Sequence, residues 1–199
     1  QYQEVIALHP NGEEPYLSLC SLYTTIKEHD RAIRTIRSLL KLDQRSENGF
    51  LALAGIYADM QQFRKAEKYY RKAISLNNSS VPALEGLVLV FEALQKTDKA
   101  IDACNAVLDI EPENYRVREK LANLYITARN FDAAREQYAA IREENPLLHY
   151  DATIKIGLIC YEQESWECAI REFSQAMHGN PNDDRVVYYA GSAFEKSGR

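Results

Sequence analysis

The chain has few side chains of the kinds that carry out chemistry, and their spacing does not assemble a catalytic or metal site. Its four histidines, His9, His29, His149 and His178, are scattered without an HExxH pair or a histidine–cysteine cluster, so no metal site is expected. No GxxxxGK[ST], GxGxxG or GxSxG stretch occurs, which excludes the usual phosphate cradles and nucleophile elbows. Adjacent carboxylates such as Glu143–Glu144 are interpreted as solvated charges near helix ends. We therefore expect neither an enzyme nor a bound cofactor.

The four cysteines, Cys20, Cys104, Cys160 and Cys168, do not form the CxxC pairs that zinc sites and thioredoxin-like proteins use. Free buried thiols are the expected state, and Cys20 and Cys160 fall at positions typical of core packing. A disulfide between Cys160 and Cys168, which both lie near one predicted turn, is the alternative. Reduced thiols favour a cytoplasmic protein, but no other feature of the sequence identifies the compartment.

Composition and charge narrow the class of partner. The net charge is −5, from 24 basic and 29 acidic residues, and no basic stripe is present to bind phosphates, so we expect no nucleic-acid partner. No apolar run reaches the roughly 18 residues that a membrane-spanning helix needs. The N-terminal QYQEVIALHP lacks the pattern of a signal peptide. Because the chain starts without Met inside a predicted helix, we expect it to be a piece of a longer protein.

The dominant pattern in the sequence is a period of 34 residues. It is carried by leucines and alanines that stand one period apart: Leu19, Leu53, Leu87 and Leu121, and Ala32, Ala66, Ala100 and Ala134. A fixed period of this length is typical of stacked structural units. We expect a single array over residues 1–199, with complete units at 13–46, 47–80, 81–114, 115–148 and 150–183. Residues 1–12 are expected to form the second helix of a partial unit, and residues 184–199 the first helix of a truncated one.

Each unit is predicted to be a pair of antiparallel helices, which makes the fold all-α. In the second unit Phe50, Leu53, Ala54 and Tyr57 follow one helical face, and a second helical pattern contains Ala66 after a break. The eighth residue of a unit is usually small, which lets two helices approach closely, as at Cys20, Ala54, Ala122, Gly157 and Gly191.

Residues typical of helix ends recur at the predicted boundaries. Ser80, Asn114, Asn130 and Ser165 stand where N-caps are expected, each with a side-chain oxygen that accepts a bond from the first turn. Pro82 lies in a predicted first turn, where proline is tolerated.

Taken together, these residues resemble the tetratricopeptide repeat family over essentially the whole chain. The resemblance rests on the small eighth residue, on alanine at position 20, on proline at position 32, and on an aromatic residue at position 11: Tyr23, Tyr57, Phe91, Tyr125 and Phe194. The chain departs from the pattern at Val88, Cys160, Gln44 and Asn78. The resemblance implies a right-handed superhelical solenoid of antiparallel helix pairs, and a non-enzymatic scaffold that binds another protein or peptide.

In this family the first helix of each unit lines a concave groove in which partner peptides usually bind. Carried over to this chain, the groove positions predict the following peptide-binding residues: Leu17, Ser21, Leu51, Gly55, Glu85, Leu89, Glu92, Arg116, Glu119, Asn123, Ile126, Tyr150, Ile154, Leu158, Tyr161 and Tyr188. Many of them are apolar or aromatic, and a contiguous exposed surface of this kind usually marks a binding site. The alternative is that several of these side chains pack against the neighbouring helix.

We expect the groove to hold an extended or amphipathic helical segment through apolar anchors, with Glu85, Glu92 and Glu119 selecting Lys or Arg nearby. The family's carboxylate clamp, which binds a peptide's C-terminus, needs Lys at position 5 and Asn at position 9. Only Asn123 matches, so a receptor of that type is disfavoured.

Two other functions remain open at this point. The array could recruit substrates for a larger enzyme, such as a glycosyltransferase, or serve as an assembly factor at a bacterial envelope. In addition, Val187, Ala190 and Phe194 have core spacing without a covering helix. We therefore expect residues 184–199 either to fray or to associate end to end with a second copy.

Overall fold

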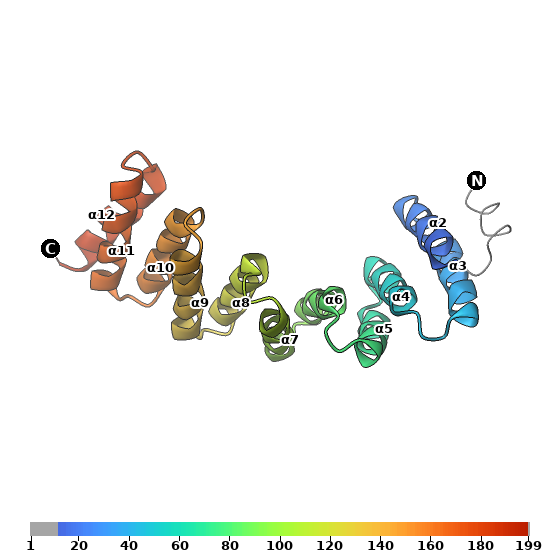
Figure 1. Ribbon diagram of the computed structural model, residues 1–199. Coiled ribbons are helices and arrows are strands. Elements are labelled where there is room, and N and C mark those ends of the chain that lie inside the picture. Colours follow the sequence, from blue (N-terminus) through green and yellow to red (C-terminus); the bar gives the residue numbers. More distant parts are fainter. Residues whose placement is uncertain (1–11, 199) are drawn as a thin grey trace. The chain divides into compact units, whose positions relative to one another are not determined.

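The computed structural model of the protein describes residues 12–198, in which eleven α-helices and no strands occur (Figure 1). The all-α fold class is therefore confirmed. The helix expected in residues 1–12 lies outside the described residues, apart from Gly12. Within residues 12–198 no helix combines the length and the apolar character needed to cross a bilayer. The chain divides after Ile110 into two compact units, each described by itself.

Unit 1, which ends at Ile110, contains three helical pairs. They are α2 (Glu13–Thr25) with α3 (His29–Leu42), α4 (Glu47–Asp59) with α5 (Phe63–Leu76), and α6 (Val81–Ala93) with α7 (Thr97–Ile110). The alanines predicted to lie where paired helices meet, Ala32, Ala66 and Ala100, have no exposed surface. Aliphatic and aromatic side chains such as Ile36 and Tyr57 complete the buried core around them.

Unit 2, which begins at Glu111, contains two pairs and a further helix. They are α8 (Tyr115–Thr127) with α9 (Phe131–Glu144), α10 (His149–Glu162) with α11 (Trp166–Gly179), and α12 (Asp184–Lys196). Its core is one cluster in which Tyr138 and Phe173 are the largest fully buried side chains. The helix α12 covers this core with Val186, Ala190 and Ala193. Its outer residues Val187 and Phe194 stay 46% and 41% exposed.

Each helical pair is joined by a turn that contains one residue in the left-handed region. Lys27, Gln61, Gln95 and Arg129 have φ between 55° and 60° and stand 34 residues apart. Glu164, with φ of 56°, follows Arg129 after 35 residues. The positive-φ residue thus repeats with the 34-residue period of the sequence. The one 35-residue step arises because residue 149 lies between the units at 115–148 and 150–183.

The left-handed residue lets the backbone close the end of the first helix. The amide of Gln61 donates to the carbonyl of Ala58, and the amide of Gln62 donates to that of Tyr57, both at 2.8 Å. These two bonds form a Schellman motif, which satisfies carbonyls that a helix end would otherwise leave without partners. The same pair of bonds closes the other four turns, where the outer acceptors are Tyr23, Phe91, Tyr125 and Cys160.

Replacing Gln61 by Gly should raise the free energy of unfolding by about 0.5–1 kcal/mol, because glycine adopts positive φ without the steric cost that a Cβ atom imposes. Chemical denaturation followed by circular dichroism measures the change. Gln61→Ala is the matched control, since it removes the exposed side chain but keeps the Cβ atom. Equal stability of the Gly and Ala variants would contradict this account of the turn.

The four predicted N-caps divide into two groups. Asn114 and Asn130 cap α8 and α9, because their Oδ1 atoms accept from the amides of Val117 at 3.1 Å and Ala133 at 3.3 Å. Ser80 and Ser165 occupy the predicted N-cap positions of α6 and α11, but their side chains do not make the expected capping bond. The backbone φ and ψ at these two serines resemble those at Asn114 and Asn130. The missing capping bonds therefore reflect the direction of the short hydroxyl side chain and not the backbone.

Ser46, which the sequence analysis did not identify, is the serine that does cap a helix. Its Oγ accepts from the amide of Gly49 at 2.8 Å and donates to Glu13 of the preceding pair. This short chain of bonds joins the first turn of α4 to the first turn of α2.

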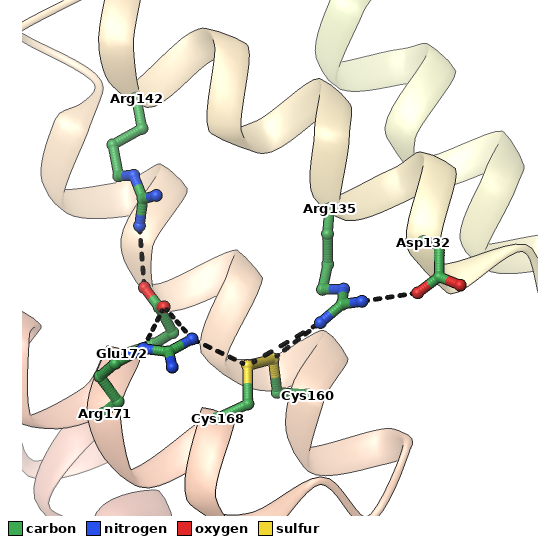
Figure 2. The surroundings of a disulfide bond; sticks show 7 residues. All are labelled: Asp132, Arg135, Arg142, Cys160, Cys168, Arg171 and Glu172. Atoms are coloured by element: carbon green, nitrogen blue, oxygen red, sulfur yellow. Dashed lines mark hydrogen bonds and ion pairs between the residues drawn. A yellow bond between two sulfur atoms is a disulfide. The ribbon is translucent and has the colours of Figure 1, made fainter.

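The cysteines also divide. Cys20 and Cys104 are buried thiols, as expected. The expectation of thiols at the other two positions was wrong, because Cys160 and Cys168 form a disulfide between α10 and α11 (Figure 2). Their Cα atoms lie 5.7 Å apart, within the usual range for a disulfide, so the short turn brings the two helices close enough.

Small residues at the eighth position have different surroundings in different pairs. A Cβ atom added to Gly157 would come within 2.7 Å of the ring of Phe173, so α10 and α11 meet there with no room for a methyl group. No atom lies within 4 Å of such a Cβ at Gly191, on α12.

These two glycines give a matched pair of substitutions. Gly157→Ala should lower the free energy of unfolding by about 1–3 kcal/mol, because the added methyl group overpacks the α10–α11 contact. Gly191→Ala should be neutral or should stabilise by up to about 1 kcal/mol, since alanine is the better helix former and meets no neighbour. Thermal unfolding of both variants tests this, and an equal loss in both would contradict it.

Candidate functional site

Unit 2 contains a cavity of about 350 Å³ that gathers three of the predicted groove residues, Glu119, Ile154 and Leu158. Its other lining residues come from α8, α9, α10, α12 and the turn before α10: Tyr115, Tyr138, Ile141, Leu148, Asp151, Ala152, Lys155 and Arg185. We call this set the unit 2 groove.

The unit 2 groove has an apolar floor and charged edges. Ile154 and Leu158 are half-buried and pack on the core cluster of unit 2. Around them stand two carboxylates, Glu119 and Asp151, and two cations, Lys155 and Arg185, of which all four are exposed. Such a surface matches a segment that has an apolar side chain flanked by charges of both signs.

Tyr138, from the second helix of its pair, forms one wall of the groove. The residue is 2% exposed, and its hydroxyl donates to Oδ1 of Asn123 at 3.0 Å. Burial, with a smaller contribution from the charge of Glu119, raises the pKa of Tyr138 well above its ordinary value. The hydroxyl is therefore a fixed donor, and it engages an oxygen of the one residue that matched the carboxylate clamp.

Arg185 is held in place by Asp183, the N-cap of α12. Its Nη2 and Nε atoms lie 2.8 Å and 3.1 Å from the two oxygens of Asp183. The same carboxylate accepts from the backbone amide of Arg185 at 3.0 Å and from the hydroxyl of Tyr150 at 3.1 Å. Asp183 thus joins the start of α12 to the start of α10 and orients a cation of the groove.

These bonds make α12 sensitive to acid. The bonds from the Arg185 side chain, and then those from Tyr150 and the Arg185 backbone, hold the pKa of Asp183 well below its ordinary value. Because the folded-state pKa is lowered, the stabilisation is fully present above the unfolded value of about 3.9 and is lost as the pH falls below it.

Asp183→Ala should speed hydrogen exchange of the α12 amides at pH 7, because the cap and the bridge to Tyr150 are both lost. The difference from wild type should shrink in strong acid, where Asp183 is protonated. Asp184→Ala, at the exposed neighbouring carboxylate, is the control and should exchange nearly as wild type. A difference that stays constant with pH would refute the role of the Asp183 charge.

Unit 1 has its own groove, a cavity of about 460 Å³ between α2 and α4. It gathers another three predicted residues, Leu17, Ser21 and Gly55, with Asp59 at its edge. A Cβ atom on Gly55 would meet no atom within 4 Å, so the floor of this groove is open. Two of its hydroxyls are engaged in their own helix, since Thr24 and Thr25 donate to the carbonyls of Cys20 and Ser21.

The other predicted residues of unit 1 do not line this cavity. Leu51, Glu85 and Glu92 are half-buried, and Leu89 on α6 is 58% exposed. In unit 2, Arg116 and Asn123 are exposed and Ile126 is half-buried against the core cluster, outside the cavity.

Tyr150, Tyr161 and Tyr188 are placed away from the unit 2 groove. The hydroxyl of Tyr150 points to Asp183, and the neighbouring Asp151 lines the groove instead. Tyr161 packs against α12: its hydroxyl lies 2.7 Å from Oγ of Ser192, and Nζ of Lys196 lies 4.8 Å from its ring centroid. Tyr188 is 69% exposed on α12. Tyr161 therefore packs on the neighbouring helix, which was the alternative to a role in the groove.

Several residues of the unit 2 groove were not predicted from the sequence. Tyr138 and Ile141 belong to the second helix of a pair, and Leu148 to a turn, whereas only first-helix positions were carried over. Lys155 is one residue beyond Ile154 and falls between the positions used. The 34-residue spacing would have found Asp151, because it occupies the second position of its unit.

Within residues 12–198 no group of three or more His, Cys, Asp or Glu side chains is arranged to hold a metal ion. His149 and His178 are exposed, and their Nδ1 atoms lie near backbone carbonyls of Arg142 and Ser174. His9 lies outside the described residues.

Comparison with known proteins gives two matching family profiles. The one described as the tetratricopeptide repeat protein 21 C-terminal ARM domain matches residues 9–121, which is more than half of the chain. The one described as a tetratricopeptide repeat matches residues 91–153. A curated relative, the RNA polymerase-associated protein CTR9 of Caenorhabditis elegans, is 26% identical over 102 residues. That match covers 50% of this chain but 9% of the relative, so the chain spans a small part of it.

Solved structures share the fold. The crystal structure of YrrB, described as a TPR protein with an unusual peptide-binding site, has a TM-score of 0.72 at 19% identity and covers 96% of this chain and 97% of its own. A crystal structure of MamA has a TM-score of 0.61 at 26% identity and covers 68% of this chain and 80% of its own.

Proposed function

This chain belongs to the tetratricopeptide repeat family, and we propose that it is a protein-interaction scaffold whose unit 2 groove binds a segment of a partner protein. The observation that carries the proposal is the cavity over α8 to α10 and Arg185, where apolar floor and charged edges lie side by side. Membership of the family supports a role in binding proteins, and the cavity supports the unit 2 groove as the place where the partner segment binds.

The chemistry of the groove suggests what the segment contains. An apolar side chain would lie against Ile154 and Leu158, where it removes apolar surface from water. A Lys or Arg of the segment would face Glu119 and Asp151, and an acidic side chain would face Lys155 or Arg185. Charges at an exposed edge contribute mainly to selectivity and association rate, whereas the buried anchor contributes more to affinity.

A charge-reversal experiment tests this assignment. The wild-type chain is used to select from a displayed library of random peptides, and the enriched sequences should pair an apolar residue with Lys or Arg. The double variant Glu119→Lys with Asp151→Lys should reverse the preference and enrich Asp or Glu. An unchanged set of selected peptides would exclude this groove as the binding surface.

The apolar anchor has its own control within unit 2. Leu158→Glu should weaken the selected peptides by at least about tenfold, since burying a large apolar side chain contributes roughly 1.5–3 kcal/mol. Leu147→Glu changes a leucine that is 91% exposed and lies outside the groove, and it should bind like wild type. Circular dichroism of both variants shows whether the helices persist. Equal binding by both variants would refute the proposal.

A further inference from the structure

The disulfide between Cys160 and Cys168 joins the two helices of one pair across their turn (Figure 2). Cys160 lies near the end of α10 and has no exposed surface, and Cys168 lies in the first turn of α11 and is half-buried. The bond therefore ties the end of one helix to the start of the next, with one sulfur closer to solvent than the other.

Non-covalent pairs occupy the same two positions in unit 1. Arg31 lies over the ring of Tyr23 at 5.7 Å, Lys65 over Tyr57 at 5.2 Å, and Lys99 over Phe91 at 6.0 Å. In every case the two residues are eight apart and flank the turn, as Cys160 and Cys168 do. The disulfide thus replaces a cation–aromatic contact, and it is the one member of this series that a change in redox state can break.

The charges around the sulfurs favour a thiolate when the bond is open. Nη1 of Arg135, from α9, lies 3.9 Å from the sulfur of Cys160 and 4.0 Å from that of Cys168. Nη2 of Arg171 lies 3.7 Å from the sulfur of Cys168. A guanidinium beside a thiol stabilises the deprotonated form, which is the form that reacts with disulfides.

Both cations beside the sulfurs also contact carboxylates. Asp132 pairs with Arg135 at 2.6 Å, and Glu172 pairs with Arg142 at 2.8 Å and with Arg171 at 3.2 Å. The two guanidinium groups that contact the sulfurs, those of Arg135 and Arg171, are thus each paired with a carboxylate while they lie within 4.0 Å of sulfur (Figure 2).

We propose that Cys160 and Cys168 form a reversible redox clasp that exchanges with a small monothiol of the glutathione class. This inference goes beyond the proposed function and does not rest on it. Contacts that do not involve the sulfurs also pack α10 against α11: Gly157 lies against the ring of Phe173, and Ala169 has no exposed surface. Opening the clasp should therefore loosen the turn and leave the fold in place.

The chemistry runs in two exchange steps. A monothiol thiolate attacks the half-buried sulfur of Cys168, forms a mixed disulfide with it, and breaks the bond to Cys160, whose sulfur leaves with the electron pair and takes up a proton. A second monothiol thiolate then attacks the sulfur of the first monothiol in this mixed disulfide. The two monothiols leave as their oxidised disulfide, and the Cys168 thiolate is released beside Arg135 and Arg171. Two monothiols are oxidised and one protein disulfide is reduced, and the reverse steps close the clasp.

The test equilibrates the whole chain in mixtures of reduced and oxidised glutathione, then alkylates and quantifies each cysteine by mass spectrometry. Cys160 and Cys168 should pass together from disulfide to thiol within the glutathione range, while the helical signal stays constant. Buried Cys20 and Cys104 are internal controls that should stay unmodified. A disulfide that resists reduction until the helices unfold would overturn the proposal.

The Arg contacts are tested on the opened form. In Cys160→Ser, the remaining Cys168 should form a mixed disulfide with oxidised glutathione, and adding Arg171→Gln should slow that reaction at pH 7 by roughly threefold. Arg129→Gln, which alters a cation away from the sulfurs, is the matched control. If neither substitution changes the rate, the charge argument fails.

Hydrogen exchange separates a clasp from an inert crosslink. On reduction, amides of the turn at 163–165 should exchange several-fold faster, whereas those of the equivalent turn at 60–62, held by Lys65 and Tyr57, should not change. Unchanged exchange at 163–165 would show that the disulfide does not restrain the turn.

Discussion

The close approach of the two helices in each pair is the constraint on which the rest of the structure depends. Ala32, Ala66, Ala100, Ala134 and Ala169 have no exposed surface, and each stands where a larger side chain would separate the helices. Helices this close leave only three residues for the connection, as at residues 60–62 between α4 and α5. So short a reversal needs one residue with positive φ, and that conformation is found at the same place in five turns.

The groove in unit 2 follows from the same constraint. The first helices α8 and α10 contribute Glu119, Ile154 and Leu158 to it, and the second helix α9, which packs closely on its neighbours, contributes Tyr138 and Ile141. The floor is half-buried since these apolar residues also touch the core cluster. The proposed binding surface and the core thus share the same short helices, so a substitution at the floor can affect both, and a control outside the groove is needed to tell the two effects apart.

The contacts that flank four of the five turns meet one structural requirement with different chemistry. In unit 1 a cation over an aromatic ring joins the two helices, a contact that tolerates motion and does not depend on redox state. In the α10–α11 pair the aromatic residue is replaced by Cys160, and a covalent bond to Cys168 takes over. The neighbouring Arg135 and Arg171 then contact sulfur rather than a ring.

The helical pairs, the spacing of the turns and the family follow from the residue pattern alone, because small and apolar residues repeat every 34 positions and periodicity is a local property. The sequence also assigned Asn114 and Asn130 as caps. Tertiary structure decided what the short-range pattern does not contain. It brought Tyr138 and Ile141 from second helices into the groove, turned Tyr150 towards Asp183, and left Ser80 and Ser165 without capping bonds. It also joined Cys160 to Cys168, since a bond between side chains depends on their distance and direction in space, which residue types alone do not specify.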